Sequence, residues 1–232
     1  MIDIVVVANN LSHKPILWEM TDNTLRTATA FAGMDIGRVL TIEQNRQAVK
    51  QTIGETMYYD FEFNYNRCLN LGFSMCNSQY VAFCNNDLHF ERNWAKFAVG
   101  AMEAGSYLSA CPSGRQVFTG VIEGYVVGTH ILGWCIIVNR NIFDIIDKFS
   151  EIVSFWYSDN VYAVQLECAR IKHILVGNSK VRHLKSKTLL KIPENRTEWT
   201  TGQREIYEQF KKEMYANSGI KIEAKKGRNN RR

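Results

Sequence analysis

Three small polar side chains follow a short apolar run in the middle of the chain. The run, residues 80–84, has the length and the residue types of a β-strand, and Asn85, Asn86 and Asp87 come directly after it. Because side chains alternate along a strand, Asn85 and Asp87 are expected to leave its end on the same side. A carboxylate beside an amide carbonyl suits a hard cation such as Mg²⁺ or Mn²⁺. The pattern indicates either a ligand site at a strand end or an ordinary turn that caps the next helix.

The elements around this stretch predict an α/β protein. Apolar runs predict strands at 2–8, 37–44, 57–61, 80–84, 107–111, 132–138, 172–176 and 181–183. Helical patterns fall at 21–33, 44–54, 64–77, 94–102, 141–149, 158–169 and 198–217. The alternation of strands and helices is typical of a doubly wound, mostly parallel sheet flanked by helices. The glycine-rich segment 114–130 is expected to form a hairpin or a mobile loop.

Length and composition indicate an ordinary globular protein. The chain has 232 residues, of which 46% are hydrophobic and 22% charged, enough for one substantial domain. We expect this domain at 1–200, a helix packed on it at 201–220, and a tail at 221–232. No apolar stretch approaches the roughly 20 residues of a membrane span, and the start lacks the features of a signal peptide. The six cysteines show no zinc or Cys-x-x-Cys spacing, so reduced thiols in a cytoplasmic protein are expected.

The positive charge of the chain is concentrated at its end. Residues 221–232 hold six basic side chains and one acidic one, so they carry the whole net charge of +5. Such a segment is expected to be disordered and can contact phosphates without reading sequence, although a solubilising tail has the same composition. The residues that we assign to nucleic-acid contact are Lys185, Lys187, Arg228 and Arg231.

The order of several short motifs resembles the GT-A glycosyltransferases, in particular the inverting family 2. The resemblance covers residues 2–185. Its positions are Ala8-Asn9-Asn10, the helix start at 65–73, Phe83-Cys84-Asn85-Asn86-Asp87, Gly133-Trp134, Trp156-Tyr157-Ser158-Asp159-Asn160 and Val181-Arg182-His183. It implies a GT-A fold, with Asp87 and His183 as ligands of Mn²⁺ or Mg²⁺ and Asp159 as the catalytic base. Two positions depart from the family pattern, since Asn85 replaces the first aspartate of the Asp-x-Asp motif and Ser158 replaces a glutamate.

The remaining assignments concern the donor and the acceptor. The residues assigned to the nucleotide donor are Ala8, Asn10, Glu43, Arg67, Asn85 and Asn86, and those assigned to the acceptor are Trp134, Trp156 and His130. Arg67 is assigned because its planar guanidinium can pair with phosphate oxygens, and Glu43 because it ends a predicted strand. Purely structural roles are the alternative for several of these residues. Asp159 could be a plain helix cap, His183 a surface residue, and the tryptophans part of the core.

The resemblance implies transfer of a sugar from a UDP-sugar to a hydroxyl, with inversion at the anomeric carbon. The compact chain resembles small phage enzymes that glycosylate 5-hydroxymethylcytosine in DNA, with arabinose or glucose as the sugar. That acceptor would have to be flipped out of the duplex, and the basic end of the chain would suit its backbone. The alternatives are a glycosyltransferase for cell-surface polysaccharide or lipid-linked glycan, a nucleotidyltransferase, and a DNA-binding module without catalysis.

Overall fold

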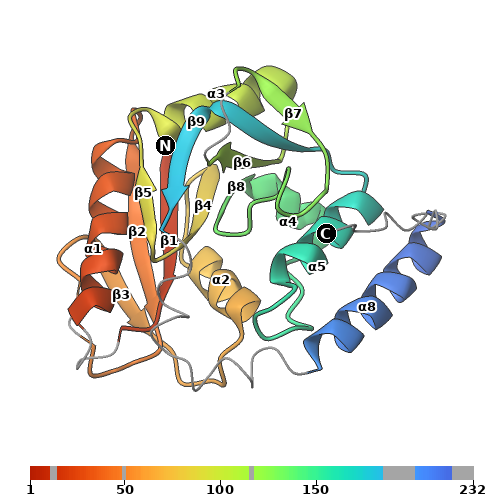
Figure 1. Cartoon of the computed structure of the whole chain (residues 1–232), viewed down its shortest axis with the longest axis horizontal. Helices are drawn as coiled ribbons and strands as arrows, with labels where there is room; N and C mark the ends of the chain where they lie inside the picture. Colours follow the sequence, from red (N-terminus) through yellow and green to blue (C-terminus); the bar gives the residue numbers. More distant parts are fainter. Residues whose placement is uncertain (11–14, 49–50, 115–117, 185–201, 221–232) are drawn as a thin grey trace, which may run out of the picture.

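A mixed β-sheet of nine strands forms the centre of the part of the chain that the computed structural model describes, residues 1–10, 15–48, 51–114, 118–184 and 202–220 (Figure 1). The strand order is β3-β2-β1-β4-β8-β6-β9-β5, and β7 pairs with β9. The strands are β1 (Ile2–Ala8), β2 (Ile36–Glu43), β3 (Glu55–Tyr58), β4 (Tyr80–Asn85), β5 (Leu88–Phe90), β6 (Ser109–Ser113), β7 (Val121–Glu123), β8 (Cys135–Asn139) and β9 (His173–His183).

Helices cover both faces of this sheet. They are α1 (Pro15–Ala30), α2 (Tyr65–Ser74), α3 (Trp94–Gly105), the 3-10 helix η1 (Arg140–Ile142), α4 (Phe143–Ile146), α5 (Ser158–Cys168) and α8 (Gln203–Ser218). Core side chains of α1 and α3 share one cluster with Ile4 and Val6 of β1, whereas those of α2 and α5 share a second cluster with Val5 and Val7. β1 is therefore buried on both faces, which explains its continuous apolar sequence.

The sheet confirms the predicted fold class. β1 pairs in parallel with β2 and β4, and β2 pairs in parallel with β3. β8 then enters antiparallel between β4 and β6, while β6 and β9 are again parallel. The carboxyl ends of β1, β2 and β4 meet at one edge of the sheet, where the polar residues that follow each strand are brought together.

Several predicted elements differ in the structure. The helix predicted at 44–54 is wrong, because residues 45–48 form a turn and Gly54 has a φ of +78°. The Glu43 carboxylate accepts a hydrogen bond from the backbone N–H of Asn45 at 2.9 Å, which stabilises that turn. The strands predicted at 172–176 and 181–183 are one strand, β9, which pairs first with β6 and then with β5.

Two helices present a different face from the one expected. The spacing of Trp94, Phe97, Ala98 and Met102 predicts one apolar side for α3, yet Phe97 is 40% exposed, whereas Trp94 is fully buried. The spacing of Ile206, Phe210 and Met214 predicts one apolar row on α8, yet Ile206 is 38% exposed; the buried residues of this helix are Gln203, Tyr207 and Tyr215. Phe210 and Met214 are half-buried against the same cluster as Tyr207 and Tyr215, so the predicted row is correct except for Ile206.

The segment 114–130, predicted as a hairpin or a mobile loop, contains β7, and in its described residues this strand pairs with β9. Within the described ranges no helix combines the length and the apolarity that crossing a bilayer requires. The six cysteines have free thiols, and five of them are buried.

Candidate active site

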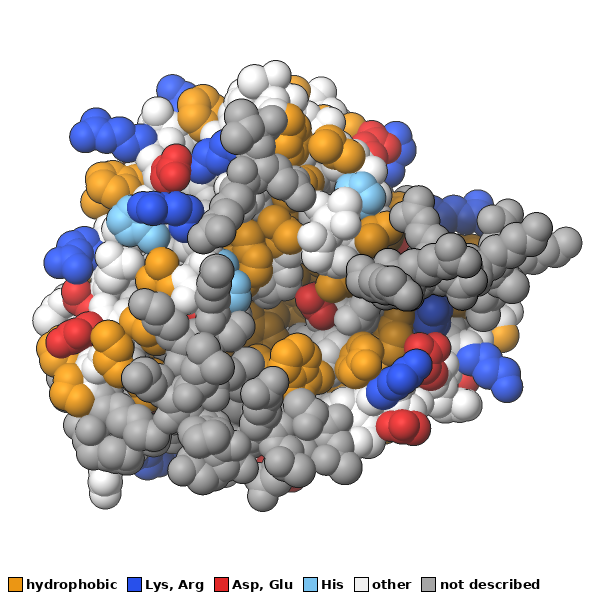
Figure 2. All heavy atoms as spheres, viewed as in Figure 1, with side chains coloured by type: hydrophobic (Ala, Val, Ile, Leu, Met, Phe, Trp, Pro, Cys, Tyr) orange, Lys and Arg blue, Asp and Glu red, His pale blue; other side chains and the backbone are white. Residues whose placement is uncertain are grey.

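A cavity of about 530 Å³ lies beyond the end of β4, between the start of α5 and the end of β9. Its lining includes Asn85, Trp134, Asp159 and His183, which are four of the side chains assigned from the sequence. Figure 2 shows hydrophobic side chains around an acidic and a histidine side chain near the centre of this face. The structure therefore brings predicted donor, metal, acceptor and base residues to one cavity.

Asp87 and His183 form a close pair at the rim of the sheet. Asp87 directly precedes β5, which runs antiparallel to β9 with Leu88 opposite His183, and Asp87 is only 2% exposed. His183 Nε2 lies 3.1 Å from Asp87 Oδ1, yet this buried nitrogen makes no hydrogen bond of good geometry. A carboxylate oxygen and an imidazole nitrogen this close together are suited to share a divalent cation.

This pair fits a metal with few protein ligands. Among the described residues, no cluster of three or more His, Cys, Asp or Glu side chains could hold an ion. Asn85 stands where a second carboxylate would supply charge, so the remaining positions around an ion would be filled by water or by phosphate oxygens. Substrate would thus complete the coordination.

Trp134 and Asn85 fix the neighbourhood of this pair. The ring of Trp134 stacks on the ring of His183, with centroids 5.9 Å apart and an angle of 22° between the planes. The backbone N–H of Asn85 donates to the carbonyl of Trp134 at 2.9 Å, and the Tyr65 hydroxyl donates to Asn85 Oδ1 at 2.8 Å. These contacts hold the imidazole and the amide beside the cavity.

Asp159 lies in the first turn of α5 and lines the same cavity. Its Oδ1 accepts a hydrogen bond from the backbone N–H of Asn160 at 3.0 Å. Burial raises the pKa of this carboxyl, because the charged form loses water. A Cβ on Gly133 would lie 2.7 Å from the Cβ of Asp159, so the segment before β8 can approach α5 this closely only with glycine there. A carboxylate with a raised pKa is suited to accept a proton.

The residues assigned to the donor on β1 and β2 lie next to one another but outside the lining of the cavity. Ala8 pairs with Glu43 across the two strands. Both carboxylate oxygens of Glu43 accept the backbone N–H of Asn10, at 3.1 and 3.2 Å, and burial raises the pKa of Glu43. Glu43 therefore organises the turn after β1. Any contact with the donor there would come from the backbone of that turn and not from the Glu43 carboxylate.

Three other assigned residues also lie outside the cavity lining. Asn86 donates from Nδ2 to the hydroxyl of Thr21 on α1 at 3.1 Å. The guanidinium of Arg67 lies over the ring of Phe61 at 4.2 Å. The ring nitrogen Nδ1 of His130 accepts from a backbone N–H within its own loop. The residues Lys185, Lys187, Arg228 and Arg231 lie outside the described residues.

An aromatic wall that the sequence assignment missed borders Asp159. Phe155, Trp156 and Tyr157 all line the cavity, and Tyr65 of α2 faces it as well. Only Trp156 of the three consecutive aromatic residues was assigned, and its side chain is 39% exposed. Three aromatic residues directly before a helix-starting carboxylate are the signal that could have revealed this wall.

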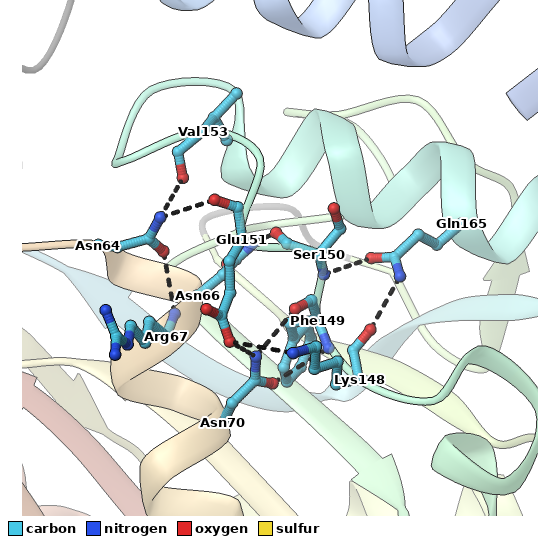
Figure 3. Close-up of polar contacts among 10 residues, drawn as sticks. All are labelled: Asn64, Asn66, Arg67, Asn70, Lys148, Phe149, Ser150, Glu151, Val153 and Gln165. Carbon is cyan, nitrogen blue, oxygen red and sulfur yellow. Dashed lines mark hydrogen bonds and ion pairs between the residues drawn. The ribbon is translucent and has the colours of Figure 1, made fainter. Parts of the chain in front are cut away.

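The segment before this wall is held by amide side chains (Figure 3). Asn64 Nδ2 donates to the carbonyls of Glu151 and Val153 at 2.8 and 3.1 Å, and Asn70 Nδ2 donates to that of Phe149 at 2.9 Å. The amide side chains that bind segment 148–153 come from α2, its cap and α5: Asn64, Asn66, Asn70 and Gln165. They give the backbone of a segment without regular structure the partners that a sheet would give it.

The sequence matches no known protein-family profile and no curated protein. GalNAc-T7, solved with UDP, GalNAc and Mn²⁺, is similar in structure with a TM-score of 0.63 and 10% identity, over 79% of this chain and 43% of that one. S. aureus TarS is similar with a TM-score of 0.58 and 10% identity, over 95% of this chain and 44% of that one.

A shorter form, TarS 1–349, is similar with a TM-score of 0.56 and 10% identity, over 94% of this chain and 71% of that one. The chain thus spans less than half the length of the GalNAc-T7 and longer TarS chains. At such identity the likeness shows the fold, which is the GT-A fold that the sequence resemblance implied.

Proposed function

We propose that this protein is a metal-dependent glycosyltransferase that uses a UDP-sugar as donor. The observation that carries the proposal is one cavity that contains His183, whose partner is Asp87, together with the buried carboxylate of Asp159. The GT-A fold supports it, as does the similar structure of GalNAc-T7 with UDP, GalNAc and Mn²⁺. A cation site near a base is what transfer of a glycosyl group from a diphosphate requires.

In the proposed reaction Asp159 takes the proton of an acceptor hydroxyl as that oxygen attacks the anomeric carbon of the sugar. The new carbon–oxygen bond forms while the bond to the diphosphate breaks, and UDP leaves with the electron pair. Attack from the face opposite the diphosphate inverts the anomeric centre. Asp87 and His183 would hold a divalent ion, which would neutralise charge on the diphosphate. The raised pKa of Asp159 brings its basicity closer to neutral pH.

The aromatic wall supports an acceptor or sugar with a ring that can stack. Trp134 presents its ring beside the Asp87–His183 pair, and Trp156 exposes a large apolar surface at the cavity. Asn85 would meet the ribose or the diphosphate from the end of β4. Aromatic faces bind both sugar rings and unstacked nucleobases, so the cavity suits either class of acceptor.

For the acceptor we propose 5-hydroxymethylcytosine in DNA, flipped into the cavity, with arabinose or glucose as the sugar. The support is the aromatic wall together with the basic residues of 221–232, which would suit a phosphate backbone. A glycan of the cell surface or a lipid-linked glycan is the second candidate, because the same wall would stack on its sugar rings.

The test combines purified protein and Mn²⁺ with UDP-glucose, UDP-arabinose and UDP-GalNAc. Hydroxymethylated DNA, unmodified DNA and a glycan are offered as acceptors, and the readouts are UDP release and the product mass. We expect a mass increase of one sugar on hydroxymethylated DNA only. Product on the glycan alone would replace the DNA acceptor, and no UDP release with any pair would overturn the proposed activity.

Matched variants show whether Asp159 performs the chemistry. Asp159→Asn is expected to lower kcat by about 10²- to 10⁴-fold, whereas Asp144→Asn, which changes an exposed carboxylate on α4, should leave it unchanged. DNA binding that persists in Asp159→Asn without any transfer by the unaltered protein would favour a DNA-binding module. Turnover of nucleoside triphosphates would favour a nucleotidyltransferase.

A further inference from the structure

The helix α8 lies outside the part of the chain that the resemblance covers, and it packs alongside α5 (Figure 1). It also contacts the segment directly before Asp159. Gln203 Oε1 accepts a hydrogen bond from the backbone N–H of Ser154 at 2.7 Å. Tyr207 stacks on Tyr157 with ring centroids 5.1 Å apart and an angle of 14°. α8 thus meets the active-site segment at two defined points.

Tyr157 has a backbone conformation that needs support. Its φ is +69°, in the left-handed region that residues with a Cβ rarely adopt, and it immediately precedes α5. Such a residue persists where its surroundings determine its conformation. Tyr157 also lines the cavity, two positions before Asp159. The stacked ring of Tyr207 therefore supports the turn from which the base projects.

The peptide of Ser154 is held from both sides. Its N–H donates to Gln203 of α8, while its carbonyl accepts the backbone N–H of Tyr65 at 2.6 Å. The hydroxyl of Tyr65 in turn donates to Asn85 at the end of β4. Contacts from α8 therefore continue through Ser154 and α2 to the side of the cavity near the Asp87–His183 pair.

We propose that Gln203 and Tyr207 are positioning residues that hold the aromatic wall and Asp159 in the geometry needed for transfer. This inference rests on the proposed function. The side chain of Gln203 is 9% exposed, so it is a buried amide directed at a loop peptide and not a solvent-facing one. α8 also has separate anchors on α5, namely the hydrogen bond from Tyr215 to Glu167 and packing on Val161 and Val164. Loss of Gln203 or Tyr207 contacts should leave the helix docked.

The test compares two pairs of variants in the full chain. Gln203→Ala removes the acceptor for Ser154, whereas Gln209→Ala changes a glutamine on the exposed side of the same helix. Tyr207→Leu removes the stacked ring, whereas Tyr207→Phe keeps it. We expect the first member of each pair to lower kcat by about tenfold to 100-fold, with the dissociation constant of Mn²⁺–UDP within twofold of the original. The second members should match the unaltered protein.

Equal kcat values across both pairs would overturn the inference. So would a parallel loss of kcat, UDP affinity and melting temperature, which would mean that α8 only stabilises the fold.

A readout without turnover separates this inference from the proposed function. The carboxyl pKa of Asp159 can be followed by carbon NMR and assigned with Asp159→Asn. Titratable side chains that interact with Asp159 are Tyr65 of α2, Cys111 of β6 and Tyr207 of α8, and the raised pKa of each keeps it neutral while the carboxyl titrates.

Tyr207→Leu is expected to lower the Asp159 pKa towards its ordinary value, and Tyr207→Phe to preserve it. An unchanged pKa in Tyr207→Leu would refute the positioning role, whereas a lowered pKa in a protein that transfers no sugar would refute only the proposed activity.

Discussion

The hydroxyl of Tyr65 donates a hydrogen bond of 2.8 Å to Oδ1 of Asn85. It joins the first residue of α2 to the last residue of β4, so a helix on one face of the sheet fixes the Asn85 amide beside the Asp87–His183 pair. The ring of Tyr65 separately packs edge-on against Phe155, with centroids 5.8 Å apart. One side chain thus links the aromatic wall to the end of the central strand.

Replacing Tyr65 by Phe removes this hydrogen bond and keeps the ring. We expect the free energy of unfolding to fall by about 1 kcal/mol and the KM for the UDP-sugar to rise severalfold, because the Asn85 amide loses its fixed orientation. Chemical denaturation and initial rates measure the two effects. Tyr107→Phe removes a tyrosine hydrogen bond to Glu123, away from the cavity, and should not change KM. An unaltered KM in Tyr65→Phe would show that Asn85 does not meet the donor.

Asn85→Asp would place a second carboxylate near Asp87. The additional charge should raise the affinity for Mn²⁺ in the presence of UDP by about tenfold, since hard cations favour anionic oxygen ligands. Titration calorimetry measures the change. Asn86→Asp is the matched control, because the Asn86 side chain bonds to Thr21 on α1 and should bring no gain in metal affinity. Equal gains in both variants would indicate a general effect of charge and not a ligand at position 85.

The Asp87–His183 pair predicts a loss of cation binding in His183→Ala. With one of the two proposed protein ligands gone, we expect Mn²⁺ affinity to fall by at least about tenfold, and chelation of the metal should weaken UDP binding to the unaltered protein. His89→Ala serves as a control, because His89 lies on β5 opposite Arg182 and not opposite His183. Unchanged Mn²⁺ binding in His183→Ala would exclude the imidazole as a ligand.

The buried carboxyl of Asp159 predicts the pH dependence of activity. Its pKa in the folded protein is raised above the ordinary value of 3.8, so kcat should fall with decreasing pH at a midpoint above that value. Asp159→Asn should lack this acid limb. A rate profile from pH 4 to pH 9 tests it, and a profile with no acid limb in the unaltered protein would remove Asp159 as the base.

The same carboxyl predicts a gain of stability on substitution. A raised folded-state pKa means that the charged form is disfavoured in the folded state, so Asp159→Asn should have the higher melting temperature at pH 7. The difference should shrink as the pH falls through the folded-state pKa and disappear below 3.8, where Asp159 is neutral in both states. Calorimetry at several pH values measures it. A variant that melts lower at pH 7 would contradict the desolvation argument.

The parts of the fold that could be predicted are those with uniform surroundings. β1 and β4 are buried on both faces, so their continuous apolar sequences identified them directly. β9 was predicted as two pieces because Gly177 and Ser179 interrupt its apolar pattern. The Ser179 hydroxyl donates to the carbonyl of Trp94 at 2.7 Å, and this bond to α3 permits a polar side chain inside the strand. That compensation depends on a distant residue and leaves no local signal.

The candidate site was predictable to a similar extent. Asp87, His183 and Asp159 could be named because strand ends and motif order place them. Asn86 and Glu43 had the same local signals, yet their polar groups bind Thr21 and the turn after β1. Nothing in the sequence distinguishes a carboxylate that organises its own turn from one that faces a cavity. The distinction arises from which way the chain turns after each strand.

The antiparallel pairing of β5 with β9 also has a consequence for biosynthesis. Asp87 comes early in the chain and His183 late, and β5 obtains its neighbour in the sheet only when β9 is present. A ribosome would therefore release β1, β2 and β4 well before the imidazole that completes the pair. Binding of a cation at the proposed Asp87–His183 site would then show that β9 has docked, so nascent chains should bind metal only after β9 has left the ribosome.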